Sequence, residues 1–471
     1  MLELSAWVAG EPVQSTERLT VTNPYTGEMV GTVAVANRGD VERAIVQGHG
    51  FRTPLTRYQR YDILMKAREI LLSRTEEFAI LITSEAGLAL RETRYEVGRC
   101  ADVLLFSAQE AMREDGQSFS GDVSPQGKPR KIFTLREPHA LVVAITPFNH
   151  PLNQVLHKLA PAIASGTPII MKPSEKTPLC ALLFAEILYQ VGLPPQSLSM
   201  LVGKTAEVAT PLAEDPRVEV LAFTGSVKIG KHLAHTAGYK KLVLELGGND
   251  ALIVLEDANM EQAVTVAAEG SFRNSGQRCT AIKRILVQNS VRAEFTRRLV
   301  EKAKEYTSGD PIDPQTVVGT VIDADSARHL EEVVQKAVAQ GAEILLGGTR
   351  TGALLAPTVL HNVPRDCEMV TQESFGPLAP IIGVEDLEDA VTYANATPYG
   401  LSAGVMTQSL EKALYAVKNL RTGMVNINEV PGYRIESSPF GGIKDSGLGI
   451  KEGVIETMKY MTYVKTFSLP W

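Results

Sequence analysis

Short apolar runs alternate with longer helical stretches through the middle of this chain. Helices are predicted over 153–165 and 178–191, and runs of strand length lie at 140–146, 168–172, 198–202, 218–223 and 241–246. Such runs, framed by helices, are typical of parallel strands that are buried on both faces. The pattern therefore predicts βαβ units and a parallel sheet, with ligand sites at the ends of its strands.

The segments on either side follow other patterns. The chain before residue 50 favours short strands and turns, and 56–115 favours helix. A second α/β series is expected between 250 and 430, with helices over 260–274 and 291–307, and the alternation in 460–467 indicates an edge strand. Since 471 residues exceed the size at which one hydrophobic core stops growing, we expect at least two domains.

The composition narrows the class of protein. A hydrophobic fraction of 44% and a charged fraction of 21% are ordinary for a soluble globular enzyme. The net charge of −7 provides no basic field for nucleic acid or an anionic membrane. The first residues lack the features of a signal peptide, and no apolar run is long enough to span a bilayer. The expected compartment is the cytoplasm, with neither nucleic acid nor membrane as a partner.

The four cysteines point to a nucleophile rather than to a structural site. They lack CxxC pairing and regular spacing, so neither a disulfide framework nor a bound metal is expected. Cys279 stands out because it follows Arg278 in a polar segment, where a positive neighbour favours the thiolate. A thiolate can attack an aldehyde carbon, and the adduct can lose hydride to leave a thioester that water hydrolyses. The alternative is a buried, inert cysteine.

Two further side chains suit that chemistry. Glu245 ends a predicted strand just before Gly247 and Gly248, where its carboxylate can activate the hydrolytic water. Asn149 lies between a strand and a helix, where its amide can donate to an oxyanion. The alternatives are a strand-end carboxylate that faces solvent and an asparagine that caps the following helix.

Two strand-to-helix loops suit a dinucleotide. Lys172 and Glu175 can bind ribose hydroxyls, although the alternative is an ordinary loop with a capping Ser174. Gly225 and Ser226 open a helix, whose free N–H groups suit a pyrophosphate. The GxGxxG fingerprint is missing from this position, so that motif alone would not find the site.

Seven motifs, in this order, strongly resemble the aldehyde dehydrogenase superfamily over nearly the whole chain. They are Pro147-Phe148-Asn149, Lys172-Pro173-Ser174-Glu175, Phe223-Thr224-Gly225-Ser226, Glu245-Leu246-Gly247-Gly248, Gly276-Gln277-Arg278-Cys279, Glu373-Ser374-Phe375-Gly376-Pro377 and Pro439-Phe440-Gly441-Gly442. The resemblance implies an α/β fold: a Rossmann-type nucleotide-binding domain, a similar α/β catalytic domain and a small β oligomerisation arm. It places these at 1–118 with 138–247, at 248–456, and at 119–137 with 457–471, and implies a homodimer or homotetramer.

The resemblance also assigns roles to residues. Cys279 is the nucleophile, Asn149 and the Cys279 N–H form the oxyanion hole, and Glu245 activates the deacylating water. Lys172 and Glu175 hold the adenosine ribose, and Glu373 holds the nicotinamide ribose. The full set of expected cofactor residues is Thr146, Lys172, Ser174, Glu175, Gly225, Ser226, Glu373 and Phe375.

Four cationic side chains set the expected substrate. Arg99 shares a helical face with apolar residues, His150 follows Asn149, Arg278 precedes Cys279, and Arg434 lies in a loop that the resemblance places at the tunnel mouth. Left unpaired in a partly buried site, such cations are costly, and a tetrahedral dianion would satisfy them. The alternatives are that Arg99 simply extends to solvent, or that the arginines pair with acids such as Glu96 or Asp102.

Departures from the family pattern support an unusual substrate. Many members have tryptophan at Phe148 and an aromatic residue at His150. The arginines are similar to those of non-phosphorylating glyceraldehyde-3-phosphate dehydrogenases, and the segment 428–434 together with His150 is closer to phosphonoacetaldehyde dehydrogenases. We therefore expect oxidation of phosphonoacetaldehyde to phosphonoacetate, with glyceraldehyde 3-phosphate or lactaldehyde as alternative substrates.

The same residues predict the cofactor and the fate of the thioester. Glu175 would repel a 2′-phosphate, which favours NAD, while the neighbouring Lys176 keeps NADP open as an alternative. The presence of Glu245 favours hydrolysis over transfer to coenzyme A. A catalytically silent structural relative is the alternative of another class, and the intact set of Cys279, Glu245 and Asn149 disfavours it.

Overall fold

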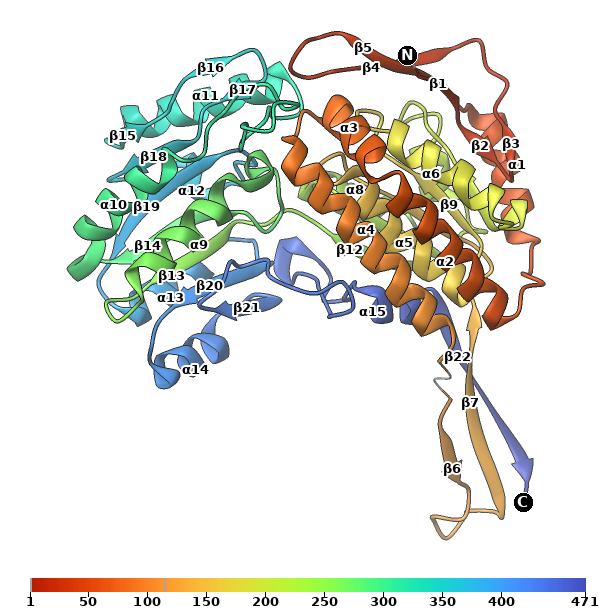
Figure 1. The fold of residues 1–471 in the computed structure, drawn as a ribbon. Helices are drawn as coiled ribbons and strands as arrows, with labels where there is room; N and C mark the ends of the chain where they lie inside the picture. The colour runs from red at the N-terminus through yellow and green to blue at the C-terminus, as the bar shows by residue number, and fades with distance from the viewer. Residues whose placement is uncertain (1, 114–115) are drawn as a thin grey trace.

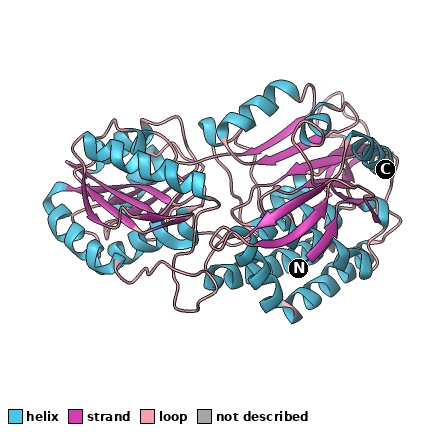
Figure 2. Cartoon of the chain, turned by 90° about the horizontal axis from the view of Figure 1, so that it is seen from above, coloured by secondary structure: helices cyan, strands magenta, loops and turns pink. Residues whose placement is uncertain are grey.

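The computed structural model describes residues 2–113 and 116–471 of the chain. Two α/β bodies lie side by side (Figures 1 and 2), and a narrow β arm projects from one of them (Figure 1). Each body is built on a seven-stranded sheet covered by helices. This is the α/β architecture that the alternating apolar pattern predicts.

The first sheet has the order β12-β11-β8-β9-β10-β2-β3. Its first five strands in this order, β12 to β10, run parallel to one another. Each of these five strands overlaps one predicted apolar run. The strands are β2 (Trp7–Val8), β3 (Glu11–Pro12), β8 (Val142–Ile145), β9 (Ile169–Lys172), β10 (Leu198–Met200), β11 (Val220–Thr224) and β12 (Lys241–Glu245).

Helices bury both faces of this sheet. One face packs against α2 (Arg57–Ser73), α3 (Thr75–Ala86), α4 (Leu90–Ala111), α5 (Pro151–Ser165) and α6 (Leu179–Gln190). The other packs against α1 (Arg38–His49), α7 (Ala209–Glu214) and α8 (Val227–Thr236). The strands are therefore apolar on both sides, which explains their continuous hydrophobic runs.

The helix α1 corrects the prediction that the chain before residue 50 forms only strands and turns. Asn37 accepts from the backbone N–H groups of Gly39 and Asp40, and Asp40 accepts from the Asn37 N–H. This capping box fixes the start of the helix, and Val41, Ala44 and Ile45 bury its apolar side. Strands do precede it, as β1 (Leu2–Ser5), β4 (Arg18–Thr22) and β5 (Met29–Ala34).

The second sheet has the order β15-β18-β19-β14-β13-β20-β21, and only β15 is antiparallel to its neighbour. The strands are β13 (Asp250–Val254), β14 (Ile282–Gln288), β15 (Glu343–Leu346), β18 (Thr358–His361), β19 (Leu378–Val384), β20 (Ser402–Met406) and β21 (Met424–Ile427). Its helices are α9 (Met260–Phe272), α10 (Asn289–Ala303), α11 (Ala324–Ala339), α12 (Glu368–Thr371), α13 (Leu387–Asn395) and α14 (Leu410–Asn419), and a hairpin joins β16 (Arg350–Thr351) to β17 (Leu354–Leu355).

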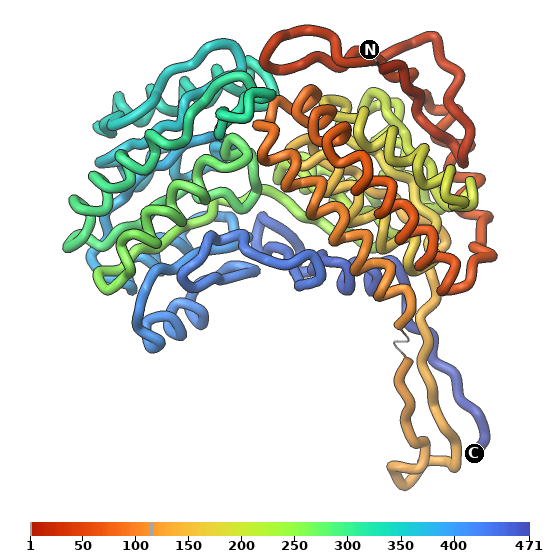
Figure 3. Tube along the Cα trace, in the orientation of Figure 1, coloured from red at the N-terminus to blue at the C-terminus, as the bar shows by residue number. Residues whose placement is uncertain are grey.

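The arm combines segments from distant parts of the chain. Its sheet has the order β22-β7-β6, from β6 (Ser118–Ser120), β7 (Arg130–Pro138) and β22 (Thr462–Pro470). The tube in Figure 3 shows how the chain after β21 returns beneath both bodies to α15 (Val454–Tyr460) and then enters the arm. The predicted terminal edge strand is therefore confirmed as β22.

The two seven-stranded sheets and the three-stranded sheet of the arm divide along the same segments as the expected domains, which supports those domain boundaries as a proposal. Within the described residues, no helix is both long and apolar enough to cross a bilayer. The cytoplasmic location stays a prediction from composition.

Candidate active site

The first sheet offers a crevice where its strand order reverses. From β8 the chain steps outward through β9 and β10, then returns to β11 and β12 on the other side of β8. Ligands of open α/β sheets bind at the carboxyl ends of the strands at such a switch point. Thr146 follows β8, Lys172 ends β9, Gly225 follows β11 and Glu245 ends β12, so these candidates meet at one edge.

The residues at this edge fit a dinucleotide. The hydroxyl of Thr146 is buried without a partner in the protein, as is that of Thr224 at the end of β11. Ser226 caps α8 by accepting from the Ile229 N–H at 3.4 Å. A side chain on Gly225 would collide with the Phe223 ring, at 2.5 Å, so the backbone there stays bare. Unpaired hydroxyls and an open helix start are what a pyrophosphate-containing ligand requires.

The predicted ribose pair is present and already joined. The Lys172 ammonium lies 2.6 Å from the Glu175 carboxylate, and Ser174 accepts from the Lys176 N–H at 3.2 Å. The Lys176 ammonium instead contacts Asp323, at 2.6 Å. The charge of Lys176 is therefore balanced by a carboxylate from the other body.

Glu373 and Phe375 approach this edge from the second body. A carboxylate oxygen of Glu373 accepts from the Gly248 N–H at 3.0 Å. The Phe375 ring meets the Phe148 ring edge to face, with centroids 6.0 Å apart. Any side chain on Gly247 would strike the Glu373 carboxylate, at 2.1 Å, so this glycine permits the close contact between the two bodies.

A cavity of about 310 Å³ collects the predicted chemistry. Cys279 and Asn149 line it together with all four expected cations, Arg99, His150, Arg278 and Arg434. These side chains come from α4, from the loop before α5, from the segment before β14 and from the segment after β21. The four cations therefore lie around one pocket, as the sequence predicted.

The backbone before Cys279 is tightly constrained. Asn274, Ser275 and Gly276 are three consecutive residues in the left-handed region, with φ of 56°, 53° and 67°. A side chain on Gly276 would meet the Gly376 carbonyl oxygen at 2.1 Å. Such a strained loop persists only when its surroundings determine it, and it brings the Cys279 thiol into the cavity.

Burial dominates the electrostatics of the thiol. It raises the pKa of Cys279 to about 12, while Lys283 is the foremost cation acting against that rise. Arg278 was expected to fill that role. Instead its Nη2 donates to the carbonyl oxygens of Glu269 and Gly270, at 3.0 and 2.7 Å. The sequence analysis therefore named the wrong principal cation for this thiol.

Asn149 does not cap the helix that follows it. The first residue of α5 is Pro151, and its N-cap makes no side-chain hydrogen bond. The Asn149 Nδ2 donates to the Gln277 carbonyl oxygen at 2.7 Å, and Asn274 donates to the Asn149 carbonyl oxygen at 3.0 Å. These two bonds tie the amide to the loop that carries Cys279, and Nδ2 has a second hydrogen for a ligand.

Glu245 is buried rather than exposed to solvent. It is 3% exposed, and a side chain on Gly441 would meet its Oε1 at 2.4 Å. Burial raises the pKa of Glu245 well above its usual value, and the nearby Glu452 carboxylate raises it further. Both Glu245 oxygens lack a protein partner, which suits a carboxyl that binds water.

An ion pair that the sequence analysis missed adjoins Glu245. The Lys158 ammonium lies 2.9 Å from the Glu452 carboxylate, and both residues are almost fully buried. Lys158 lowers the pKa of Glu245 while Glu452 raises it. The pKa of Glu245 is therefore set in part by a buried pair whose members lie 294 residues apart in sequence.

One of the four expected anion ligands is already neutralised. Arg99 donates through Nε and Nη2 to the two carboxylate oxygens of Glu436, and His157 shares that carboxylate. The prediction of an unpaired Arg99 is therefore wrong, and its partner is neither Glu96 nor Asp102. His150 lies 3.5 Å from Glu96.

Arg278 and Arg434 line the cavity, and each keeps one donor without a partner. The Arg278 Nε and the Arg434 Nη1 are buried without a protein partner. The Arg434 guanidinium also stacks on the Phe440 ring, 3.9 Å from its centroid. Burial lowers the pKa of Arg278 to about 10 and also lowers that of Arg434. Each of these cations would gain from a bound anion.

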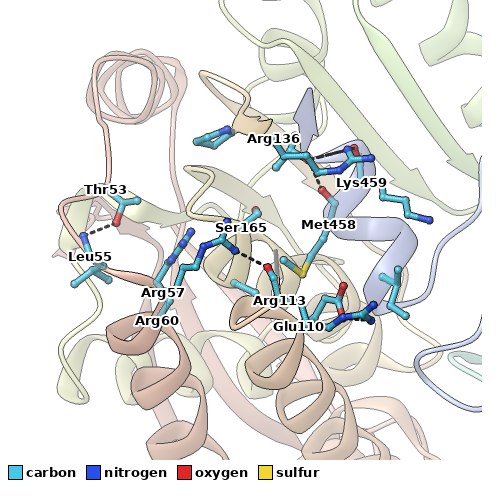
Figure 4. A pocket seen from close by; sticks show the side chains of 14 residues that line it. Thr53, Leu55, Arg57, Arg60, Glu110, Arg113, Arg136, Ser165, Met458 and Lys459 are labelled. Atoms are coloured by element: carbon cyan, nitrogen blue, oxygen red, sulfur yellow. Dashed lines mark hydrogen bonds and ion pairs between the residues drawn. The ribbon is translucent and has the colours of Figure 1, made fainter. Parts of the chain in front are cut away.

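A second, larger cavity lies elsewhere. It has a volume of about 490 Å³ and opens between α2, the end of α4, the base of the arm and α15 (Figure 4). Arg113 pairs there with Glu110 at 3.0 Å, and Arg57 donates to the Arg113 carbonyl oxygen at 2.7 Å. No cysteine is among the described residues that line it, so the smaller cavity is the better candidate.

The described residues contain no cluster of three or more side chains suited to holding a metal ion. Lys158, Lys283, Glu436 and Glu452 are the site residues that the sequence analysis missed. Each pairs with a residue distant in sequence or with backbone, so local motif spacing held no signal for them.

Comparison with known proteins agrees with this geometry. The model of the aldehyde dehydrogenase family matches residues 7–467. The chain is 39% identical to a 3-sulfolactaldehyde dehydrogenase of Priestia aryabhattai, over 97% of this chain and 96% of the relative, and 37% identical to a lactaldehyde dehydrogenase of Methanococcus aeolicus, over 95% and 96%. A crystal structure of NADP-dependent glyceraldehyde-3-phosphate dehydrogenase from Bacillus halodurans, complexed with NADP, matches with a TM-score of 0.97 at 32% identity, over 100% and 99% of the two chains.

Proposed function

The chain belongs to the aldehyde dehydrogenase family, and we propose that it oxidises a small anionic aldehyde to a carboxylate through a thioester on Cys279. One observation carries this proposal: the Cys279 thiol and two guanidiniums with unpaired donors, Arg278 and Arg434, share one cavity. A nucleophile beside fixed cations suits an electrophile that carries negative charge.

The first step is attack of the Cys279 thiolate on the aldehyde carbon. The alkoxide that forms is stabilised by the second Nδ2 hydrogen of Asn149 and by the Cys279 N–H. Because Asn149 is bonded to the Gln277 carbonyl and to Asn274, its amide is held in place before the reaction begins. A nicotinamide bound at the switch point would accept the hydride and so leave a thioester on the sulfur.

The second step is hydrolysis of that thioester. We assign deprotonation of the attacking water to Glu245, because both of its oxygens lack a protein partner and its raised pKa makes it a stronger base than an exposed carboxylate. The Glu452 carboxylate, which is held by Lys158 and acts electrostatically on Glu245, is the next acceptor that we propose for the proton. Water, not coenzyme A, is therefore the proposed acceptor of the acyl group.

The anion is the finer part of the proposal. Phosphonoacetaldehyde, inferred from the sequence, stays a candidate because a guanidinium fork matches the oxygens of a tetrahedral anion. A sulfonated aldehyde is the second candidate, since the relative from Priestia aryabhattai is named for sulfolactaldehyde. Neutralisation of Arg99 by Glu436 lowers the positive charge of the site, which favours the sulfonate monoanion over a phosphonate dianion.

The cofactor is proposed to be NAD, with NADP as the alternative. Lys172 and Glu175 would hold the adenosine ribose, and the Glu175 carboxylate would repel a 2′-phosphate. Lys176 favours NADP less than the sequence suggested, because Asp323 already balances the charge of its ammonium. Glu373 would hold the second ribose.

We also propose a homodimer or homotetramer assembled through the arm. The exposed edge strand β22 carries Val464, Phe467 and Leu469, which are 52%, 39% and 50% exposed. Apolar side chains on an open strand edge are normally covered by another chain. Sedimentation or light scattering will measure the assembly.

An aldehyde panel tests the proposed function. It contains phosphonoacetaldehyde, sulfoacetaldehyde, 3-sulfolactaldehyde, glyceraldehyde 3-phosphate, lactaldehyde and a neutral alkanal, each with NAD and with NADP. We expect NADH formation with one of the anionic aldehydes, unchanged by coenzyme A and abolished in Cys279→Ala. Turnover of the neutral alkanal alone would reject the anion assignment, and NADH formation by Cys279→Ala would reject the mechanism. No turnover with any aldehyde would favour a silent relative.

A further inference from the structure

Lys283 is a buried lysine just after residues 274–281, the loop that carries Cys279 and is called the nucleophile loop below. It lies in β14, four residues after Cys279, and its side chain is 2% exposed. A buried ammonium is costly unless oxygen atoms surround it, so its contacts identify what holds it there.

The Lys283 ammonium binds the backbone of the nucleophile loop. Its Nζ donates to the carbonyl oxygens of Cys279 at 2.8 Å, Arg278 at 2.9 Å and Ala281 at 3.3 Å. The Glu373 carboxylate lies 3.6 Å away on a further side. The three carbonyl oxygens use the three donors of the ammonium group, and the Glu373 carboxylate offsets its charge, which together account for its burial.

The bond to the Arg278 carbonyl has a geometric consequence for the oxyanion hole. The Arg278 C=O and the Cys279 N–H belong to one planar trans peptide, in which the two groups point in opposite directions. When Lys283 fixes the carbonyl, it also fixes the direction of the Cys279 N–H, which is the proposed backbone donor to the oxyanion. The bond to the Cys279 carbonyl fixes the next peptide plane, so the residue is held from both sides.

Gly248 shows how closely this loop is packed. A side chain there would meet the Cys279 carbonyl oxygen at 2.5 Å. The Gly248 N–H donates to the same Glu373 oxygen that approaches Lys283. The loop, the ammonium and the proposed ribose carboxylate therefore form one contiguous group.

From this geometry we propose that Lys283 is a positioning residue, which orients the Cys279 N–H and holds a fixed positive charge against the backbone of Cys279. This inference rests on the proposed role of Cys279 as the nucleophile. Lys283 touches the backbone, not the reacting atoms, and so acts through Cys279. The role of principal cation, which the sequence suggested for Arg278, belongs to Lys283.

The first test is alkylation of the thiol by iodoacetamide without aldehyde or cofactor. Loss of one nearby positive charge raises a thiol pKa by about one unit, which lowers the fraction of thiolate. The thiolate that remains is more nucleophilic, so part of this loss is offset. Alkylation of Lys283→Met and of Lys283→Gln should therefore slow by about threefold to tenfold. Lys283→Arg keeps the charge and should restore the rate. An alkylation rate equal to wild type in both neutral variants would overturn the electrostatic role.

The matched control is Lys240→Gln. Lys240 also donates to two backbone carbonyls, those of Ala213 and Asp215 at 2.6 and 2.8 Å, but it precedes β12 at the end of the strand opposite Glu245. Its replacement should leave the alkylation rate unchanged. Melting temperatures recorded for every variant show which are folded, and if Lys283→Met fails to fold, Lys283→Gln, which keeps an amide donor, carries the test.

The second test is the NADH burst with a substrate found in the panel. A disoriented oxyanion donor should lower the burst rate of Lys283→Gln by about tenfold or more, with a smaller change in KM. A purely structural lysine would lower the melting temperature and leave the burst rate per folded molecule unchanged, which would contradict the proposal. If no aldehyde is oxidised, the alkylation test still decides the role of Lys283, so the two proposals fail separately.

Discussion

Glu436 binds the guanidinium of Arg99 through both carboxylate oxygens, and it draws His157 to the same carboxylate. Although burial acts to raise it, His157 and Arg99 hold the pKa of Glu436 well below its usual range. The carboxylate is therefore charged, and Arg99 has little positive charge left for a substrate. The charge available to an anion comes mainly from Arg278 and Arg434.

Replacement of Arg434 therefore tests the anion site. A hydrogen bond to a charged group is worth about 1.5–3 kcal/mol, so Arg434→Met should lower kcat/KM for an anionic aldehyde by about tenfold to a hundredfold. The neutral aldehyde should lose far less. The double variant Arg99→Met with Glu436→Gln is the matched control and should change the ratio little, because the charges of Arg99 and Glu436 cancel in the wild type. Steady-state kinetics with both aldehydes will measure the two ratios, and equal losses in Arg434→Met would remove the anion site.

Replacement of Glu436 tests the ion pair as a stabilising contact. Glu436→Gln leaves Arg99 and His157 without their partner in a largely buried site, which should cost about 3–5 kcal/mol of unfolding free energy. A carboxyl with a lowered folded pKa stabilises the protein fully above its unfolded pKa, and that contribution declines as the pH falls below it.

Urea unfolding at pH 7 and pH 4 checks both parts of that prediction. The difference between wild type and Glu436→Gln should be largest at pH 7 and smaller at pH 4. An equal difference at the two pH values would show that the carboxylate charge is not what stabilises the fold.

Replacement of Glu245 separates the two chemical steps. In Glu245→Gln the thioester should still form, because acylation needs the Cys279 thiolate and the oxyanion donors. Rapid mixing should record a burst of NADH of about one equivalent per site, followed by turnover slowed by about a hundredfold or more. Loss of the burst as well would assign Glu245 to activation of the thiol.

Selective labelling tests the accessibility and pKa of the nucleophile. Cys100, Cys180 and Cys367 are buried, whereas Cys279 lines the cavity. Iodoacetamide should therefore label Cys279 first in the native protein. Since burial raises its pKa to about 12, the rate should rise with pH without a plateau near neutrality.

Mass spectrometry of the labelled peptides will identify the site, with Cys279→Ser as control. A plateau in rate near pH 7 would show that the free protein stabilises the thiolate more than its burial allows.

Sequence patterning predicted the sheets because parallel strands covered on both faces need uninterrupted apolar runs, as in β8 and β11. It missed α1, whose signal is the short capping box from Asn37 to Asp40 rather than a long apolar face. It selected Cys279, Asn149 and Glu245 as candidates because their segments follow one another in the order of the family motifs.

The ion pairs around the site could not be predicted from local sequence patterns. Lys158 meets Glu452 across 294 residues and Arg99 meets Glu436 across 337, so only the folded chain pairs them. Lys283 binds backbone carbonyls, which every residue provides and no motif distinguishes. The expected charge of the substrate site was therefore too high by one arginine.

The most direct test of the central claim compares three aldehydes of similar shape that differ in charge. Sulfoacetaldehyde carries a tetrahedral anion where 3,3-dimethylbutanal carries a neutral tert-butyl group, and phosphonoacetaldehyde adds a second charge. We predict that kcat/KM with NAD favours an anionic member by about a hundredfold or more, the worth of two charge-assisted hydrogen bonds. Equal kcat/KM for the neutral and anionic aldehydes would contradict the account.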